Sequence, residues 1–243
     1  MARIRKWKGV YSAPLGCAFL FGMVSLFLLA GPGRGAPEGV DAALSSFEDM
    51  AARYREIRDY RCVLIKQEWL HNRMDQQKMI LLFRKPMDIK LTWITPNSGQ
   101  QAVYRVQKSK NRFRARKGGW LGFFTVDMDI NDKRALETSR YPITCAGIGA
   151  VLEKTMQDIG LGQCEVRTLG EENVDGQPCL HLEFHSLGPK NFHQSLRTEF
   201  WVDKKSGLPI QLKMMDYEQR MIGCYTFSQL ELNVGLTDKD FEL

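Results

Sequence analysis

The chain has 243 residues, and its apolar (44%) and charged (26%) fractions are typical of a globular protein with a single domain. A formal net charge of +6 would suggest an anionic polymer as a partner, but residues 1–36 hold five basic residues and no acidic one. The remainder therefore carries only +1. This balance argues against nucleic acid as a partner.

The first 36 residues predict a secretory signal peptide or an N-terminal membrane anchor. A basic start is followed by an uncharged stretch, Ala13–Ala30, and then by a run of small residues at 31–36. The apolar run is longer than the roughly 7–15 residues of a usual signal core and approaches the roughly 20 residues of a spanning helix. We favour cleavage, because small residues follow, and keep anchoring to the inner membrane by residues 13–30 as the alternative. In both cases residues 37–243 form one domain exported to the periplasm or cell envelope.

The exported part predicts two amphipathic helices and about ten strands. Apolar residues at helical spacing predict the helices over Gly39–Asp59 and Ala146–Ile159. Alternating or continuous apolar runs predict strands at 60–70, 78–83, 88–95, 101–107, 113–116, 164–171, 178–187, 196–202, 208–216 and 221–232. We expect the stretch 117–144 to be irregular.

Two local patterns refine the predicted sheet. Asp175-Gly176 is a strong signal for a tight hairpin turn. In the last strand the apolar phase shifts between Phe227 and Leu230, which predicts a β-bulge. Two helices cannot cover both faces of so long a sheet. We therefore predict an α+β, mainly β, fold: a strongly curved antiparallel sheet, or open and unclosed barrel, with the helices covering its concave side.

One histidine-rich strand offers the best pattern for a metal. His181, Glu183 and His185 share a strand face and could ligate zinc or iron, which keeps a metal-dependent hydrolase as a minor alternative. The simpler interpretation is a polar outer face, since Leu180, Leu182 and Phe184 form the matching inner face. The acidic run 127–132 resembles a calcium loop only in outline, and a solvated loop is the better interpretation. The chain has no Walker loop, dinucleotide fingerprint or HExxH motif, so we predict no enzyme activity and no cofactor.

Cysteines and basic residues leave further alternatives open. No C-x-x-C pair occurs, while export permits disulfides; the odd number of cysteines after the N-terminal segment leaves at least one thiol unpaired. These cysteines are Cys62, Cys145, Cys164, Cys179 and Cys224. Basic residues also gather around one predicted hairpin: Arg105, Lys108, Lys110, Arg112, Arg114, Arg116 and Lys117. This hairpin is either simply solvated or a contact for the acidic lipid headgroups of a membrane surface or for an anionic envelope polymer.

Several segments resemble LolA-like proteins, the periplasmic lipoprotein-sorting and lipid carriers, and an uncharacterised bacterial family close to them. They are FWVDKKSGLPIQL (Phe200–Leu212), LNVGLTDKDF (Leu232–Phe241), YRCVLIKQE (Tyr60–Glu68) and SRYPITCAGI (Ser139–Ile148). The resemblance implies a bent, unclosed barrel whose helices form a lid over an apolar cavity that binds acyl chains. The inward candidates that it implies are Ile89, Leu91, Trp93, Leu208, Ile210 and Leu212.

The expected function follows from this resemblance. We expect an exported envelope protein, not an enzyme, that binds lipid or lipoprotein acyl chains in the cavity of a curved sheet. The alternative is a membrane-anchored envelope sensor or scaffold that uses the same sheet to bind a protein partner.

Overall fold

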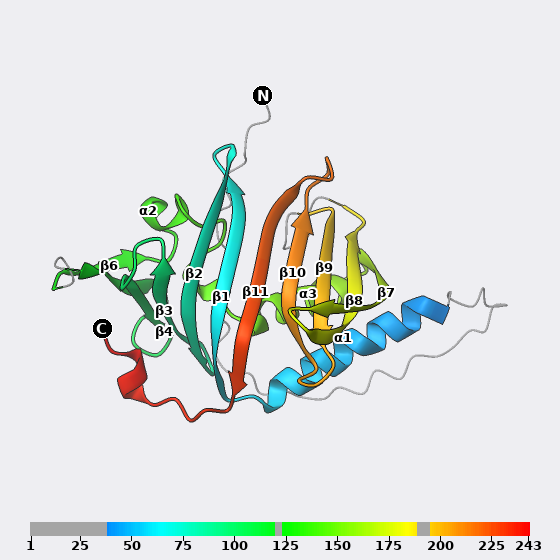
Figure 1. Cartoon of the computed structure of the whole chain (residues 1–243), viewed down its shortest axis with the longest axis horizontal. Helices are drawn as coiled ribbons and strands as arrows, with labels where there is room; N and C mark the ends of the chain where they lie inside the picture. Colours follow the sequence, from blue (N-terminus) through cyan, green and yellow to red (C-terminus); the bar gives the residue numbers. More distant parts are fainter. Residues whose placement is uncertain (1–37, 120–122, 189–194) are drawn as a thin grey trace. The chain divides into compact units, whose positions relative to one another are not determined.

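A computed structural model gives the structure of the chain and describes residues 38–119, 123–188 and 195–243 (Figure 1). These residues belong to one compact unit. The predicted signal peptide or anchor lies outside them, as does Trp120.

Eleven strands of the described residues form one antiparallel sheet, which is not closed into a barrel (Figure 1). Its order is β6-β5-β4-β3-β2-β1-β11-β10-β9-β8-β7, so pairing of β1 with β11 joins a meander of the first six strands to a meander of the last five. The strands are β1 (Asp59–Leu70), β2 (Arg73–Arg84), β3 (Asp88–Thr95), β4 (Gln101–Arg105), β5 (Arg112–Arg116), β6 (Thr125–Asp129), β7 (Cys164–Val174), β8 (Gln177–Ser186), β9 (Arg197–Asp203), β10 (Leu208–Met215) and β11 (Met221–Leu232).

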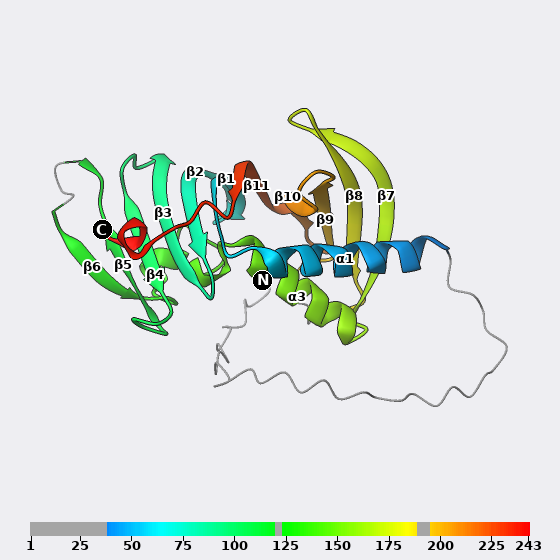
Figure 2. The same cartoon turned by 90° about the horizontal axis from the view of Figure 1, so that it is seen from below.

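Two helices, α1 (Glu38–Glu56) and α3 (Ile148–Gly160), lie on the concave side of the sheet (Figure 2). Shorter helical turns are α2 (Lys133–Leu136), η2 (Ile143–Cys145) and η3 (Asp238–Phe241). The predicted fold class, a mainly β, open and strongly curved antiparallel sheet with helices on its concave side, is confirmed.

Buried aromatic rings join the helices to the sheet. Phe47 of α1 is fully buried and meets Phe200 of β9 edge to face, with 5.2 Å between ring centroids. Tyr60 of β1 stacks on Phe83 of β2 at 5.0 Å, and its hydroxyl accepts a hydrogen bond of 2.9 Å from the backbone N–H of Ile148. The residue before α3, a glycine, has no capping side chain, so Tyr60 satisfies an amide that the helix start would otherwise leave unpaired.

The predicted turn and bulge are both confirmed. Asp175 and Gly176 have φ angles of +50° and +80°, in the left-handed region that a tight hairpin turn requires. The pairing of β1 with β11 shifts register between Arg61 and Val63, opposite Gln229, whose φ is +53°. A second shift, between Pro209 and Gln211, makes Ile210 the extra residue of β10. Bulges of this kind bend a sheet and increase its twist.

The stretch 117–144 is more ordered than we expected, because it contains the edge strand β6. Val126 and Met128 alternate with polar neighbours there, and the strand pairs with β5. The first half of the acidic run 127–132 therefore belongs to the strand β6, which ends at Asp129. Its last residue, Asp132, accepts a 2.9 Å hydrogen bond from the backbone N–H of Arg134 and so caps α2.

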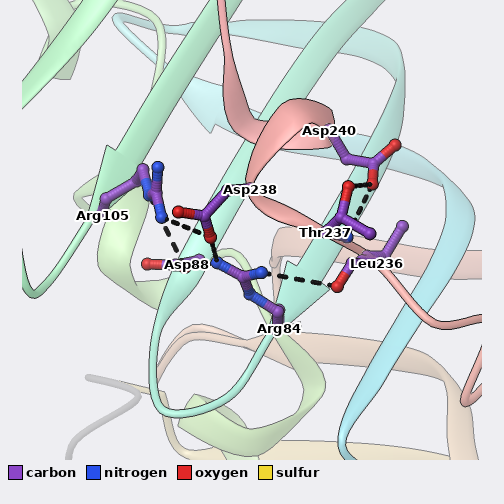
Figure 3. A network of polar contacts seen from close by, with 7 residues as sticks. All are labelled: Arg84, Asp88, Arg105, Leu236, Thr237, Asp238 and Asp240. Carbon is purple, nitrogen blue, oxygen red and sulfur yellow. Dashed lines mark hydrogen bonds and ion pairs between the residues drawn. The ribbon is translucent and has the colours of Figure 1, made fainter.

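A charged network attaches the C-terminal residues to the sheet (Figure 3). Arg84 places Nη2 at 2.6 Å from Asp88 Oδ2 and 2.7 Å from Asp238 Oδ1. Arg105 Nη2 lies 2.8 Å from the same Asp238 oxygen. The guanidinium of Arg84 also lies over the ring of Phe241, 4.9 Å from its centroid. Two arginines thus bridge the buried Asp88 of β3 to the exposed Asp238 of the tail.

The network predicts that Asp238 stabilises the fold at neutral pH and loses this effect in acid. Hydrogen bonds from Arg84, and then from Arg105, lower the pKa of Asp238 to about 2. In the unfolded chain the pKa of an aspartate is about 3.9. The charged carboxylate of Asp238 therefore stabilises the fold fully at pH values above about 3.9, and this stabilisation is lost as the pH falls toward 2. We expect Asp238→Asn to lower the melting temperature at pH 7 and to differ less from wild type at pH 3. The exposed Glu48→Gln serves as control, and an undiminished difference at pH 3 would refute the assignment.

Candidate functional site

A cavity of about 570 Å³ lies between the sheet and residues 133–146, which we call the cover segment. The sheet contributes an apolar lining from both sides of the β1–β11 junction. Its apolar members are Leu64, Met79, Leu91, Trp93, Ala102, Phe113, Ala115, Val126, Met128, Leu212, Met214 and Phe227. Phe124, directly before β6, also lines the cavity. The cover segment adds Leu136, Ile143 and Ala146, and α3 adds Val151. The arrangement can sequester an apolar chain from water.

The six inward candidates divide into two groups. Leu91, Trp93 and Leu212 line the cavity. Ile89 and Leu208 are fully buried in the main core and do not belong to the lining. Ile210, the extra residue of the β10 bulge, packs instead in a separate cluster with Cys179 and Trp201, against which Val174 lies.

Strand pairing brings the predicted Trp93 together with three lining residues that were not predicted: Leu64, Met79 and Phe227. Leu64 of β1 lies opposite Phe227 on one side and Met79 on the other, and Met79 lies opposite Trp93 of β3. These four side chains form one apolar row across the sheet. The sequence signal that could have indicated Leu64 is its spacing of two residues from Cys62, which places both side chains on the same buried face of β1.

Two small residues leave room next to this row. Ala102 of β4 lies opposite Leu91 of β3 on one side and Ala115 of β5 on the other. All three line the cavity. Larger side chains at the two alanines would fill the space that the cavity occupies.

One end of the cavity is polar and buried. Glu68 is 1% exposed and Lys66 is 8% exposed, and Lys66 Nζ lies 3.3 Å from Glu68 Oε2. The Tyr225 hydroxyl donates a 2.5 Å hydrogen bond to Glu68 Oε1. Burial, and then the nearby charge of Glu68, raises the pKa of Tyr225 far above its usual range, so the phenol stays protonated and donates.

These polar side chains fasten the cover segment to the sheet. Lys66 donates to the backbone oxygen of Thr138 at 3.0 Å, and the backbone N–H of Arg140 donates to Glu68 Oε2 at 2.9 Å. Gln77 donates to the same Thr138 oxygen at 2.8 Å, while its own oxygen accepts from Trp93 Nε1 at 2.9 Å. The strands thus hold main-chain groups that lie more than sixty residues away in sequence.

The histidine strand is tied into a polar network in which His181, Glu183 and Glu199 are buried. His181 stacks on Trp201 at 4.3 Å, with Nδ1 at 3.1 Å from Glu172 and Nε2 at 3.4 Å from Glu199. Glu183 lies 3.7 Å from Arg197 Nε. Within the described ranges, no group of three or more His, Cys, Asp or Glu residues is placed to hold a metal ion. Leu182 and Phe184 are fully buried in the core, as the polar-face interpretation predicted.

Two of the described cysteines, Cys62 and Cys164, are unreactive thiols. Cys62, Cys164, Cys179 and Cys224 are free thiols in the described part of the chain. Burial raises the pKa of Cys62 and of Cys164 to about 12, which keeps both thiols protonated and inert at neutral pH. In the same described part, no helix is long and apolar enough to cross a membrane, and the predicted segment 13–30 lies outside it.

The open curved sheet, the helices on its concave side and the apolar cavity beneath a cover segment together form the fold that the resemblance to LolA-like proteins implied. The chain belongs to the family described as "Protein of unknown function (DUF1571)", whose model matches residues 57–243. No curated protein matches the chain.

Several solved structures are similar to this chain at low sequence identity. Pseudomonas aeruginosa MucB, in its complex with MucA, is 12% identical over 83% of this chain and 61% of its own, with a TM-score of 0.50. Mycobacterium tuberculosis lipoprotein LppX is 13% identical over 81% and 98%, also with a TM-score of 0.50. The LolA superfamily protein NE2245 from Nitrosomonas europaea is 11% identical over 83% and 97%, with a TM-score of 0.34. The chain thus spans about three fifths of MucB.

Proposed function

We propose that this protein binds one or more acyl chains of a lipid or lipoprotein in the cavity and acts as a carrier in the cell envelope. The observation that carries the proposal is the apolar lining of a cavity of about 570 Å³ beneath the cover segment. Burial of each methylene contributes about 0.8 kcal/mol, so roughly ten buried methylenes contribute about 8 kcal/mol before the entropic costs of binding. This carrier function requires no chemical reaction.

The location that we propose follows from two observations. The basic start and apolar run of residues 1–30 have the layout of a targeting segment. The lipoprotein LppX is among the solved structures that are similar to this chain. We therefore propose export to the periplasm, with anchoring by residues 13–30 as the alternative to cleavage.

Filling the cavity tests the proposal. We expect Ala115→Trp to weaken fluorescent fatty-acid binding by about tenfold or more, because the indole occupies space that the acyl chain needs. A titration with the fluorescent probe measures the affinity, and native mass spectrometry after gentle purification shows whether lipid co-purifies.

Overpacking alone could cost about 1–3 kcal/mol of stability, so the melting temperature of each variant is recorded as well. Ala115→Leu gives a smaller obstruction, and Ala42→Trp, at an exposed position on α1, is the matched control. An apo mass without lipid, together with no probe binding by the wild type, would overturn the proposal.

A protein partner is the second candidate, supported by the complex of MucB with MucA. In that case the sheet would serve an envelope sensor or scaffold rather than a carrier. A purified protein that contains no lipid, binds no fatty acid and captures an envelope protein would favour this candidate.

A further inference from the structure

The charged residues that line the cavity are unequally balanced. Four are basic and one is acidic: Lys66, Arg116, Lys117, Arg134 and Glu68. Two of the basic groups are already engaged, because Lys66 pairs with Glu68 and Arg134 Nη2 lies 2.8 Å from Asp132 Oδ2. The remaining cations, Arg116 and Lys117, form no ion pair with any residue of the described ranges.

The two cations are continuous with the apolar lining. On β5, Phe113 and Ala115 line the cavity, and Arg116 and Lys117 follow directly along the chain and line it too. Arg116 donates one hydrogen bond of 2.8 Å, to Gln101 Oε1, and keeps further N–H groups for another acceptor. The carboxylate of Asp127 on the neighbouring β6 lies 3.8 Å from Arg114, which does not line the cavity.

We propose that the cavity selects amphiphiles with an anionic head group, which Arg116 and Lys117 bind while the acyl chain lies along Phe113 and Ala115. The inference rests on the proposed function and names the ligand class of the same site. Carboxylates and phosphates both accept charge-assisted hydrogen bonds from a guanidinium fork and an ammonium. A fatty acid and an anionic phospholipid share this chemistry.

Three probes with the same chain test the inference: dodecanoate, dodecyl phosphate and dodecanol compete with a fluorescent fatty acid for the wild-type cavity. We expect at least one anionic probe to bind about tenfold more tightly than dodecanol, a difference within the range of charge-assisted hydrogen bonds. A preference for the phosphate indicates a phospholipid, and a preference for the carboxylate indicates a fatty acid.

Matched double variants locate the preference. Arg116→Gln with Lys117→Gln should abolish it, so that the three probes bind this double variant with similar affinities. Lys108→Gln with Lys110→Gln removes the same charge from the same hairpin, at residues that do not line the cavity, and should retain it. Equal affinity of the wild type for all three probes, or a preference that survives the first double variant, would overturn this inference but not the proposed function. Failure of every probe to bind would overturn the proposed function.

Discussion

Glu68→Ala is expected to destabilise the domain by roughly 3–5 kcal/mol, the loss typical of breaking a buried ion pair by removing one partner. The substitution leaves the Lys66 ammonium, which is 8% exposed, without its carboxylate. It also leaves the backbone N–H of Arg140 and the hydroxyl of Tyr225 without their acceptor. Urea unfolding gives the free-energy change, and hydrogen exchange at the Arg140 amide reports whether the cover segment has loosened.

Three further variants show whether the loss comes from the uncompensated charge. Glu68→Gln keeps one oxygen acceptor and should lose less. Adding Lys66→Met to Glu68→Ala should recover part of the loss, because the unpaired cation is then gone. Glu231→Ala, an exposed acid on the neighbouring β11, should change the stability by about 0.5 kcal/mol or less. The explanation is wrong if Glu68→Ala costs no more than Glu231→Ala.

This buried pair also shows what the sequence could not predict. In β1 the alternation placed Lys66 and Glu68 on the phase of Cys62 and Leu64, and charged residues normally indicate a wet face. In the structure these two side chains face the cavity. Their burial is possible because they form hydrogen bonds with main-chain groups of Thr138 and Arg140. A contact that spans seventy-two residues leaves no local signal in the sequence.

Local patterns, in contrast, predicted most of the sheet. Hairpin turns, alternation and the phase shift in β11 depend on neighbouring residues, and these features are confirmed. The strand β6 was missed because five residues at a sheet edge carry only two apolar side chains, Val126 and Met128. Edge strands often carry such polar composition, which protects them from pairing with other chains.

Strand periodicity predicted the candidate site as a face of the sheet, whereas the cavity was implied only by the resemblance to LolA-like proteins. Ile89 belongs to a row in which Tyr60, Phe83, Ile89 and Tyr104 lie opposite one another, and this row is filled. Farther along the same strand, Leu91 lies opposite Ala102, and the space remains open. Where the cavity begins depends on where the helices and aromatic rings stop covering the concave side, which strand periodicity does not encode.

Phe47→Ala is expected to destabilise the domain by about 3–5 kcal/mol, the usual loss for truncating a buried phenylalanine. The ring is fully buried between α1 and the sheet and contacts Phe200 at 5.2 Å, so the substitution removes apolar burial and leaves a void. Most of the stability of a helix of this length comes from packing of its apolar face. Urea unfolding followed by tryptophan fluorescence measures the shift in midpoint.

The matched control for Phe47 lies one residue away. Glu48→Ala changes an exposed position of α1 and should shift stability by about 0.5 kcal/mol or less. None of the described α1 side chains lines the cavity, so folded Phe47→Ala protein should bind dodecanoate as tightly as wild type. Equal unfolding midpoints for Phe47→Ala and Glu48→Ala would show that α1 does not stabilise the sheet through this contact. A weakened affinity at unchanged fold would instead show that the position of α1 determines the shape of the cavity.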